Sequence, residues 1–200
     1  MKPLEATVFD YGVGNLHSLA KALERAGARV RVSAEARDLA SAACVVLPGV
    51  GAAPRVMARL APALDALRHK LESGAPALGV CIGMQVLFES SEEGGAVCAG
   101  FFPGNVRRLT AERLPHIGWT PVEHRGDPLF AGIPTGEYFY FVHSYAAGPA
   151  GSVATADCGG PFAAAWRKAN VYGVQFHPEK SSAAGLALLS NFVSFAESVA

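Results

Sequence analysis

Short apolar runs alternate with amphipathic segments through the first ninety residues of the chain. The apolar runs predict buried strands at residues 6–9, 29–32, 44–47 and 77–80. The segments between them have helical apolar spacing or begin with proline, and they predict helices at 16–26, 54–60 and 62–73 and a polar helical turn at 35–42. Strands that alternate with helices predict an α/β fold with an open, mostly parallel twisted sheet flanked by helices.

The pattern changes after residue 100. Segments rich in aromatic and β-branched residues lie between proline and glycine turns, and they predict strands at 101–109, 115–123, 138–145 and 162–167. A strong strand follows at 171–176, and a last helix at 183–199 has Ser181 or Ser182 as its expected cap. Because no linker or repeat interrupts this order, we expect one domain over residues 1–200, with a smaller antiparallel β region beside the parallel sheet.

The composition narrows the classes of function. Lys plus Arg and Asp plus Glu number 17 each, so the formal net charge is +0, which argues against nucleic acids and anionic membranes as partners. The chain has no run of 18 apolar residues and its start does not read as a signal peptide, so we expect no membrane span and no secretion. A chain with no net charge and a mean hydropathy of +0.24 is poorly protected against association, which favours a partner protein.

The four cysteines are widely scattered and form no Cys-x-x-Cys pair or Cys/His cluster, so we expect no metal site, free thiols and a reducing, cytoplasmic setting. Among them Cys44, Cys98 and Cys158 carry no signal beyond a structural role. Gly12 and Gly14 match two glycines of the dinucleotide-binding fingerprint, but His17 stands where its third glycine belongs. We therefore interpret this loop as a tight strand-to-helix turn and expect no cofactor.

Cys81 is the strongest candidate nucleophile. The spacing Gly79-x-Cys81-x-Gly83, between an apolar strand and a helical pattern, is that of a nucleophile elbow with sulfur in place of a hydroxyl. The flanking glycines let the backbone pass close by, and the start of the following helix favours the thiolate, which is the form that attacks. A buried structural cysteine beside a glycine turn is the alternative.

Two further segments complete a catalytic arrangement. His177 and Glu179 are two residues apart with Pro178 between them, so in an extended strand end they face the same side. With Cys81 they form a predicted Cys–His–Glu triad of nucleophile, acid/base and orienting carboxylate. The glycine-rich run 48–51 follows the third strand, where open α/β sheets build their sites, and its N–H groups could face an oxyanion beside Cys81.

These motifs together resemble the class I glutamine amidotransferases, through the elbow at 79–85 and the run Gln-Phe-His-Pro-Glu at 175–179. Within that class the chain is similar to the glutaminase subunits of imidazole glycerol phosphate synthase. The narrower resemblance rests on blocks that span nearly the whole chain, at 10–16, 48–51, 115–119, 143–145 and 177–181. Val80 and Ile82 stand where similar sequences often have other aliphatic residues. The resemblance implies the flavodoxin-like fold of this class.

The resemblance also implies a reaction: hydrolysis of L-glutamine to glutamate and ammonia through a thioester on Cys81. The expected oxyanion donors are the N–H groups of Ile82 and of the loop residues Gly49, Val50 and Gly51. The implied substrate-binding residues are Gln85, Glu93, His143, Ser144 and Tyr145. Glu92 is adjacent to Glu93, and a shift of one residue would exchange the two.

The implied partner is a cyclase subunit with a (βα)8 barrel, which forms a heterodimer with this chain. Its barrel would conduct the ammonia to a ribotide and yield imidazole glycerol phosphate and aminoimidazole carboxamide ribotide in histidine biosynthesis. The interface candidates are Asn15, Trp119 and Lys180. The glycines of the 48–51 loop permit a peptide flip, so we expect low glutaminase activity until a loaded partner binds.

Three other functions remain possible from the sequence. The first is a glutaminase subunit for anthranilate, pyridoxal phosphate or nucleotide synthesis, against which the blocks at 115–119 and 143–145 argue. The second is a stand-alone cysteine hydrolase or peptidase, which would need no partner. The third is a scaffold with a vestigial triad, against which the intact nucleophile, histidine and carboxylate argue.

Overall fold

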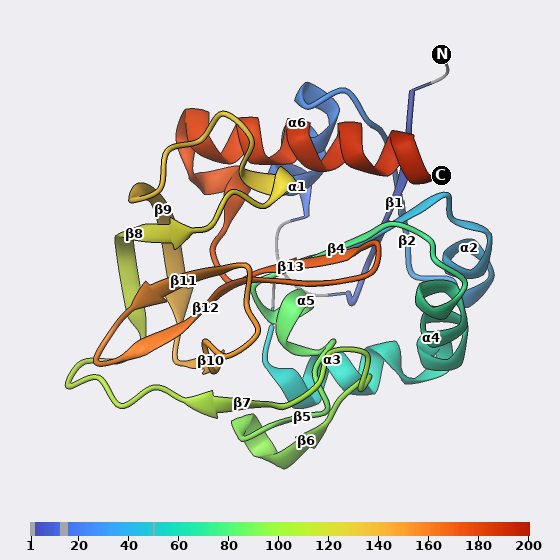
Figure 1. Ribbon diagram of the computed structural model, residues 1–200. Coiled ribbons are helices and arrows are strands. Elements are labelled where there is room, and N and C mark those ends of the chain that lie inside the picture. Colours follow the sequence, from blue (N-terminus) through green and yellow to red (C-terminus); the bar gives the residue numbers. More distant parts are fainter. Residues whose placement is uncertain (1–2, 13–15, 50) are drawn as a thin grey trace.

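The computed structural model describes residues 3–12, 16–49 and 51–200 of the chain (Figure 1). Its main feature is a nine-stranded sheet in the order β2-β1-β3-β4-β13-β12-β11-β8-β9. The first five of these strands are parallel, and each of the last four is antiparallel to the neighbour before it. In sheet order, their bounds are Arg29–Ser33, Glu5–Phe9, Cys44–Leu47, Ala77–Val80, Val171–Val174, Pro161–Lys168, Ala154–Asp157, His116–His124 and Glu137–His143.

A second, four-stranded sheet has the order β10-β7-β5-β6. Its strands are short and run over Tyr145–Ala147, Asn105–Arg108, Ser90–Ser91 and Ala96–Val97. Figure 1 shows this sheet below the antiparallel half of the main sheet, on the side of α3. The expected α/β fold class is therefore confirmed, and the antiparallel strands mostly extend the main sheet.

Helices cover both faces of the parallel strands, as Figure 1 shows. One face holds α1 (His17–Arg25) and α6 (Ser182–Val199), whose apolar residues share a core with the sheet. The other face holds α2, α3, α4 and the short α5, which span Ala36–Ser41, Ala53–Leu60, Leu64–Glu72 and Ile82–Gln85. Among the described residues there are also four 3-10 turns: η1 (Ala61–Ala63), η2 (Glu93–Gly95), η3 (Pro128–Phe130) and η4 (Pro178–Lys180).

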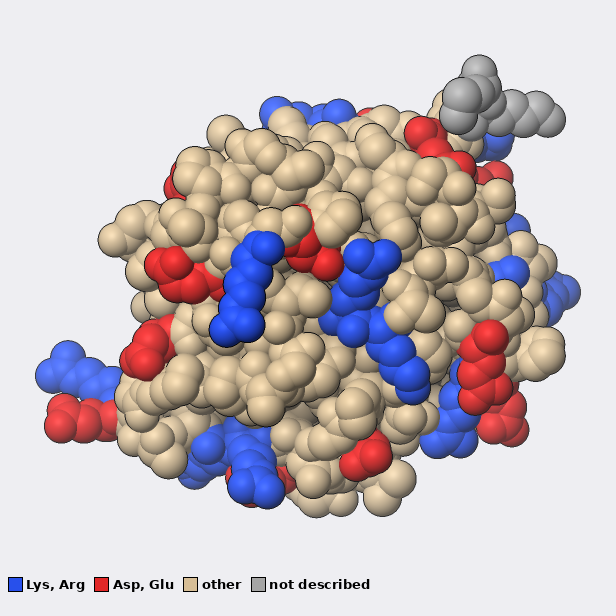
Figure 2. Space-filling model, in the orientation of Figure 1, with Lys and Arg blue, Asp and Glu red and all other residues tan. Residues whose placement is uncertain are grey.

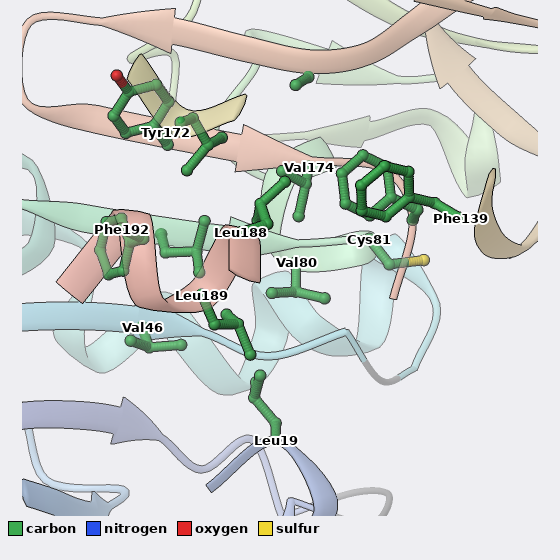
Figure 3. Close-up of a cluster of buried hydrophobic side chains, with 14 of the residues drawn as sticks. Leu19, Val46, Val80, Cys81, Phe139, Tyr172, Val174, Leu188, Leu189 and Phe192 are labelled. Atoms are coloured by element: carbon green, nitrogen blue, oxygen red, sulfur yellow. The ribbon is translucent and has the colours of Figure 1, made fainter. Parts of the chain in front are cut away.

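The core ends at the candidate nucleophile. Figure 3 shows Val80 and Val174 of the central strands packed near Leu188 of α6, with Cys81 next in the row and its sulfur pointing away from these residues. By length and composition α6 could span a membrane, but Leu188, Leu189 and Phe192 are fully buried against the sheet, which accounts for its apolar character. Charged side chains of both signs are scattered over the face in Figure 2, without a field of one sign.

Most predicted strands and helices are found within a few residues of their expected bounds, and the exceptions have physical causes. The pattern missed β11, whose alanines carry little strand propensity. The helix predicted after Cys81 is short and ends at Gln85, and the segment 138–145 breaks at Ser144 into β9 and β10. Only 105–108 of the predicted strand 101–109 is extended. Ser181 occupies the cap position of α6, but its hydroxyl bonds to the His177 carbonyl and not to the helix.

Candidate active site

Cys81 lies at the turn between β4 and α5 in a strained backbone conformation. Its φ of 50° and ψ of −111° fall in a region that residues with a Cβ rarely adopt, and such strain typically costs about 1–3 kcal/mol. The turn is held by hydrogen bonds on both sides of the residue. The Cys81 N–H donates to the Val174 carbonyl at 2.7 Å, and the Cys81 carbonyl accepts from the N–H groups of Met84 and Gln85. This geometry supports the predicted nucleophile elbow.

Glycines make the close packing around this turn possible. A Cβ on Gly79 would lie 2.6 Å from the Gly83 carbonyl oxygen, so the elbow helix can pack on its own strand only without a side chain there. A Cβ on Gly49 would lie 2.9 Å from Cε1 of His177 and 3.1 Å from Cβ of Cys81. The lack of a side chain at position 49 therefore leaves room for both the candidate nucleophile and the candidate base.

His177 is buried and paired with Glu179. The His177 Nδ1 and the Glu179 Oε1 are 2.8 Å apart, while the other oxygen, Oε2, is buried without a hydrogen-bond partner among the described residues. Burial by itself favours the neutral imidazole, but the hydrogen bonds and charges of Cys81 and Glu179 outweigh it and raise the pKa of His177 to about 9. The imidazole is thus suited to hold a proton beside a thiolate.

The predicted pairing is present, but the expected reason for it is wrong. The strand β13 ends at Val174, three residues before His177, so the pair does not lie on one face of a strand end. Pro178 instead begins the 3-10 turn η4, which brings the Glu179 carboxylate back onto the imidazole. The His177 N–H donates to the Tyr140 carbonyl at 2.9 Å, which fixes the backbone before this turn.

A cavity of about 190 Å³ opens beside the Cys81 sulfur. Its walls include every substrate-binding residue expected from the sequence: Gln85, Glu93, His143, Ser144 and Tyr145. Glu92 is not among the lining residues, and its carboxylate accepts from the Arg108 N–H at 2.8 Å. The Glu93 carboxylate accepts from the Ala53 N–H at 2.7 Å and so caps the start of α3. The structure therefore favours Glu93 over Glu92 as the pocket residue.

His143 is in the pocket wall, yet both of its ring nitrogens are engaged within the protein. Its Nδ1 lies 2.9 Å from the Tyr145 carbonyl, which can only accept, and its Nε2 lies 3.0 Å from Nδ1 of His116. The Nε2 of His116 in turn lies 2.8 Å from the Thr120 hydroxyl. Burial is the main cause that lowers the pKa of His143 to about 4, so the ring is neutral and shapes the wall through its contacts.

The expected oxyanion donors lie partly within the described residues. Ile82 is the first residue of α5, so its N–H has no partner inside the helix. Gly51 has a φ of 100° and lines the cavity together with Cys81 and Ile82. Val50 lies outside the described residues. The expected flip of the 48–51 loop stays a prediction.

Two of the three interface candidates are neighbours on the surface. Trp119 of β8 is 49% exposed and contacts the Tyr140 ring edge-on, with 6.1 Å between ring centroids. Lys180 places its Nζ 5.8 Å from the centroid of the same ring. Asn15 lies outside the described residues. Because the Tyr140 carbonyl accepts from the His177 N–H, this patch is joined directly to the candidate base.

The sequence interpretation missed Gln175. Its side chain is fully buried, and its Nε2 lies 3.5 Å from the Cys81 sulfur. Its Oε1 accepts a hydrogen bond from Nε2 of Gln85 at 2.9 Å. The sequence held one sign of this role. Gln175 lies two residues before His177, and in extended backbone this spacing places both side chains on the same side.

The other three cysteines differ from Cys81 in their surroundings. All four are free thiols. Burial raises the pKa of the Cys44 thiol to about 12 and that of Cys98 to about 11, and burial together with the Asp157 charge raises the pKa of Cys158. These thiols are therefore held protonated. Within the described residues, no group of three or more His, Cys, Asp or Glu side chains is arranged to bind a metal ion.

Comparison with known proteins gives consistent matches over most of the chain. The model of the family "Glutamine amidotransferase class-I" matches residues 7–195. The imidazole glycerol phosphate synthase subunit HisH of Moorella thermoacetica is 46% identical over 200 residues, which cover 96% of this chain and 94% of that protein. The subunit of the same name from Methylococcus capsulatus is 48% identical over 205 residues, with 93% and 94% covered.

Solved structures of lower identity share the fold. The structure of PurLQS from Thermotoga maritima superposes with a TM-score of 0.76 at 18% identity, covering 97% of this chain and 99% of that one. The structure of a putative GMP synthase protein from Thermoplasma acidophilum gives a TM-score of 0.72 at 20% identity, with 99% and 96% covered. At such identities the similarity speaks for the fold alone.

Proposed function

Because this chain belongs to the class I glutamine amidotransferases, we propose that it is the glutaminase subunit of an imidazole glycerol phosphate synthase and acts in histidine biosynthesis. The observation that carries the proposal is Cys81 in the wall of the cavity, hydrogen-bonded to His177, which is itself paired with Glu179, in a chain 48% identical to the subunit from Methylococcus capsulatus. A cytoplasmic location, expected from the cysteine usage, belongs to the same proposal.

The first half of the reaction forms a thioester. The Cys81 thiolate attacks the carboxamide carbon of L-glutamine, and the carbonyl oxygen becomes an oxyanion that the Ile82 N–H and an N–H of the Gly49–Gly51 loop stabilise. The bond to nitrogen then breaks as protonated His177 donates its proton to the departing group, which leaves as ammonia. Loss of one oxyanion donor typically lowers such a rate by about 100- to 1000-fold.

The second half regenerates the enzyme. Neutral His177 takes a proton from water, whose oxygen attacks the thioester carbon, and glutamate departs as the sulfur–carbon bond breaks. The thiolate and the imidazolium are then restored for the next cycle. Glu179 holds the ring through the 2.8 Å contact to Nδ1, which leaves Nε2 for proton transfer and stabilises the charged ring.

The cavity supports a substrate with the chemistry of glutamine. Glu93 offers a carboxylate for an α-amino group and Gln85 offers an amide, and Ser144 and Tyr145 also line the cavity. The His143 ring is occupied by its own hydrogen bonds, so we assign it to shaping this wall and not to binding the ligand directly.

The released ammonia has to reach its acceptor without meeting bulk water, where it becomes ammonium and ceases to be a nucleophile. We propose that a cyclase subunit with a (βα)8 barrel covers the site, forms a heterodimer with this chain and conducts the ammonia. The exposed patch of Ile117, Trp119 and Tyr138 on β8 and β9, with Lys180 beside it, supports this docking face. The patch is joined to His177 through Tyr140.

The test measures glutamate release from glutamine by the purified chain alone, with the cyclase subunit, and with the cyclase subunit and its ribotide. We expect low activity alone and strong activity in the complete mixture. Cys81→Ala should abolish glutamate release. The matched control is Cys158→Ala, which replaces a partly exposed thiol 77 residues after Cys81 and should leave glutamate release unchanged. Ester or peptide hydrolysis by the chain alone would instead identify a stand-alone hydrolase, and full glutaminase activity alone would refute the gated loop.

A further inference from the structure

A pair of buried amides links the candidate nucleophile to the pocket wall. The Gln175 Nε2 lies 3.5 Å from the Cys81 sulfur, and its Oε1 lies 2.9 Å from Nε2 of Gln85. The same Gln85 nitrogen lies 2.7 Å from the Tyr145 carbonyl oxygen. Gln175 is fully buried and Gln85 is 4% exposed, so water does not substitute for these contacts.

The direction of this hydrogen-bond chain is fixed by its far end. The Tyr145 carbonyl can only accept, so the Gln85 atom that faces it is the nitrogen. Both hydrogens of that nitrogen are then used, one toward Tyr145 and one toward Gln175. The Gln175 atom that faces Gln85 must therefore be the oxygen, which leaves its N–H group directed at the Cys81 sulfur.

An N–H donor aimed at sulfur distinguishes the two forms of the nucleophile. A thiolate is a strong acceptor and gains from the donor, whereas a neutral thiol is a weak acceptor and gains little. The second contact of the sulfur, 3.8 Å to the Val142 carbonyl oxygen, has the opposite preference, because it suits the thiol hydrogen. Gln175 thus provides a side-chain donor that favours the thiolate where Val142 favours the thiol.

The same chain orients the pocket. Because the nitrogen of Gln85 is held by Gln175 and Tyr145, the amide oxygen of Gln85 is the atom left for a ligand in the cavity. A rotated Gln85 amide would place two oxygens against each other at the Tyr145 carbonyl or at Gln175, which is unfavourable. One buried side chain therefore supports both the nucleophile and a residue of the pocket wall.

We propose that Gln175 is a positioning residue that holds the Cys81 sulfur as a thiolate through its N–H group and fixes the Gln85 amide with its oxygen toward the substrate. This inference rests on the proposed glutaminase function for its biological meaning. Its chemical content concerns only the sulfur and the amides, so it can be tested without glutamine.

The experiment measures the rate at which iodoacetamide alkylates Cys81 as a function of pH, followed by mass spectrometry of the Cys81 peptide. The variants are Gln175→Met, which keeps the length and removes the donor, and Gln175→Glu, which keeps the shape and replaces the donor by a carboxylate oxygen. We expect the midpoint of the pH profile to move up by about one pH unit in the first variant and further in the second, so that at pH values well below the midpoint of the unmodified protein the first variant is alkylated about tenfold more slowly.

The matched control is Asn191→Leu. Asn191 donates two hydrogen bonds from its side-chain nitrogen to the carbonyls of Leu129 and Ala131, so its loss removes an amide with two hydrogen bonds without touching the cysteine. Its alkylation midpoint should equal that of the unmodified protein. Thermal unfolding of every variant checks that it is folded.

An unchanged midpoint in folded Gln175→Met, or a shift equal to that of Asn191→Leu, would overturn the proposal. Failure of both Gln175 variants to fold would assign the residue to the structure of the core and would equally overturn it. Because the unmodified chain is assayed separately for glutamate release, a shifted midpoint in a chain without glutaminase activity would keep the positioning role and refute the proposed function.

Discussion

Replacement of Gly49 by alanine should damage catalysis far more than it damages the fold. The added Cβ would lie 2.9 Å from Cε1 of His177, 3.1 Å from Cβ of Cys81 and 3.1 Å from Cγ1 of Val80. Carbon atoms in ordinary contact are about 3.5–4.0 Å apart, so a displacement of about 0.6–1 Å is needed. Val80 and Cys81 are held by the sheet and the elbow, whereas the imidazole is held mainly through Glu179. We therefore expect the ring to move.

The magnitude follows from that displacement. A misplacement of about 1 Å in a catalytic group can lower a rate by about 100-fold, so we expect kcat to fall by about 30- to 100-fold in Gly49→Ala. Overpacking of one methyl group costs about 1–2 kcal/mol of unfolding free energy, which for a chain of this size lowers the Tm by about 2–8 °C. The protein should therefore remain folded at 25 °C while its activity is largely lost.

The assay compares glutamate release in the complex with the cyclase subunit and thermal unfolding of the chain alone. The matched control is Gly148→Ala, because a Cβ on Gly148 meets no heavy atom within 4 Å and its φ is not in the left-handed region. The control should retain both activity and Tm. Near-normal activity of folded Gly49→Ala would refute the inference that the lack of a side chain at position 49 keeps the candidate base in place.

Two further predictions concern charge. Burial is the main cause that lowers the pKa of His143 to about 4, so its contribution to the free energy of unfolding is complete above pH 6.5, and about 3 kcal/mol of it is lost as the pH falls through 4. The pKa of His177 is raised to about 9, so its contribution to the free energy of unfolding is complete below pH 6.5 and is lost as the pH rises through 9. The Tm should therefore be highest near pH 6–7, and His177→Asn should remove the alkaline decline; an alkaline decline that persists in this variant would contradict the assignment. Separately, Glu93→Ala should raise the KM for glutamine by about tenfold and cost about 1 kcal/mol through the lost cap at Ala53, whereas Glu92→Ala should leave KM unchanged. Equal changes in KM for both variants would show that the pocket assignment is wrong.

The parallel half of the fold was accessible from the sequence because its signals are local. The strand at Cys44–Leu47 and the strand at Ala77–Val80 are continuous apolar runs that are buried at every position, and the structure has them with the predicted bounds. The turn at Cys81 could likewise be predicted, because the glycines that it requires, Gly79 and Gly83, lie two residues away on each side. Such features depend on few residues close in sequence.

The remaining features depend on contacts that local patterns do not encode. The strand Ala154–Asp157 has weak intrinsic propensity and is extended because it pairs with strands on both sides. The choice between Glu92 and Glu93 is made by the 3-10 turn η2, which begins at Glu93 and brings its carboxylate to the start of α3. The contact of Gln175 with Cys81 joins residues 94 positions apart. Each of these follows from tertiary pairing.

The insertion of β13 between β4 and β12 has a consequence for biosynthesis of the protein itself. The candidate nucleophile follows β4 and the candidate base follows β13, and these two strands pair only after the long intervening segment has been synthesised. A nascent chain that has not yet emerged beyond β12 already holds its cysteine but has neither its histidine nor its carboxylate. Hydrolysis that depends on all three of these side chains therefore cannot begin before residue 179 has been synthesised and β13 has paired with β4.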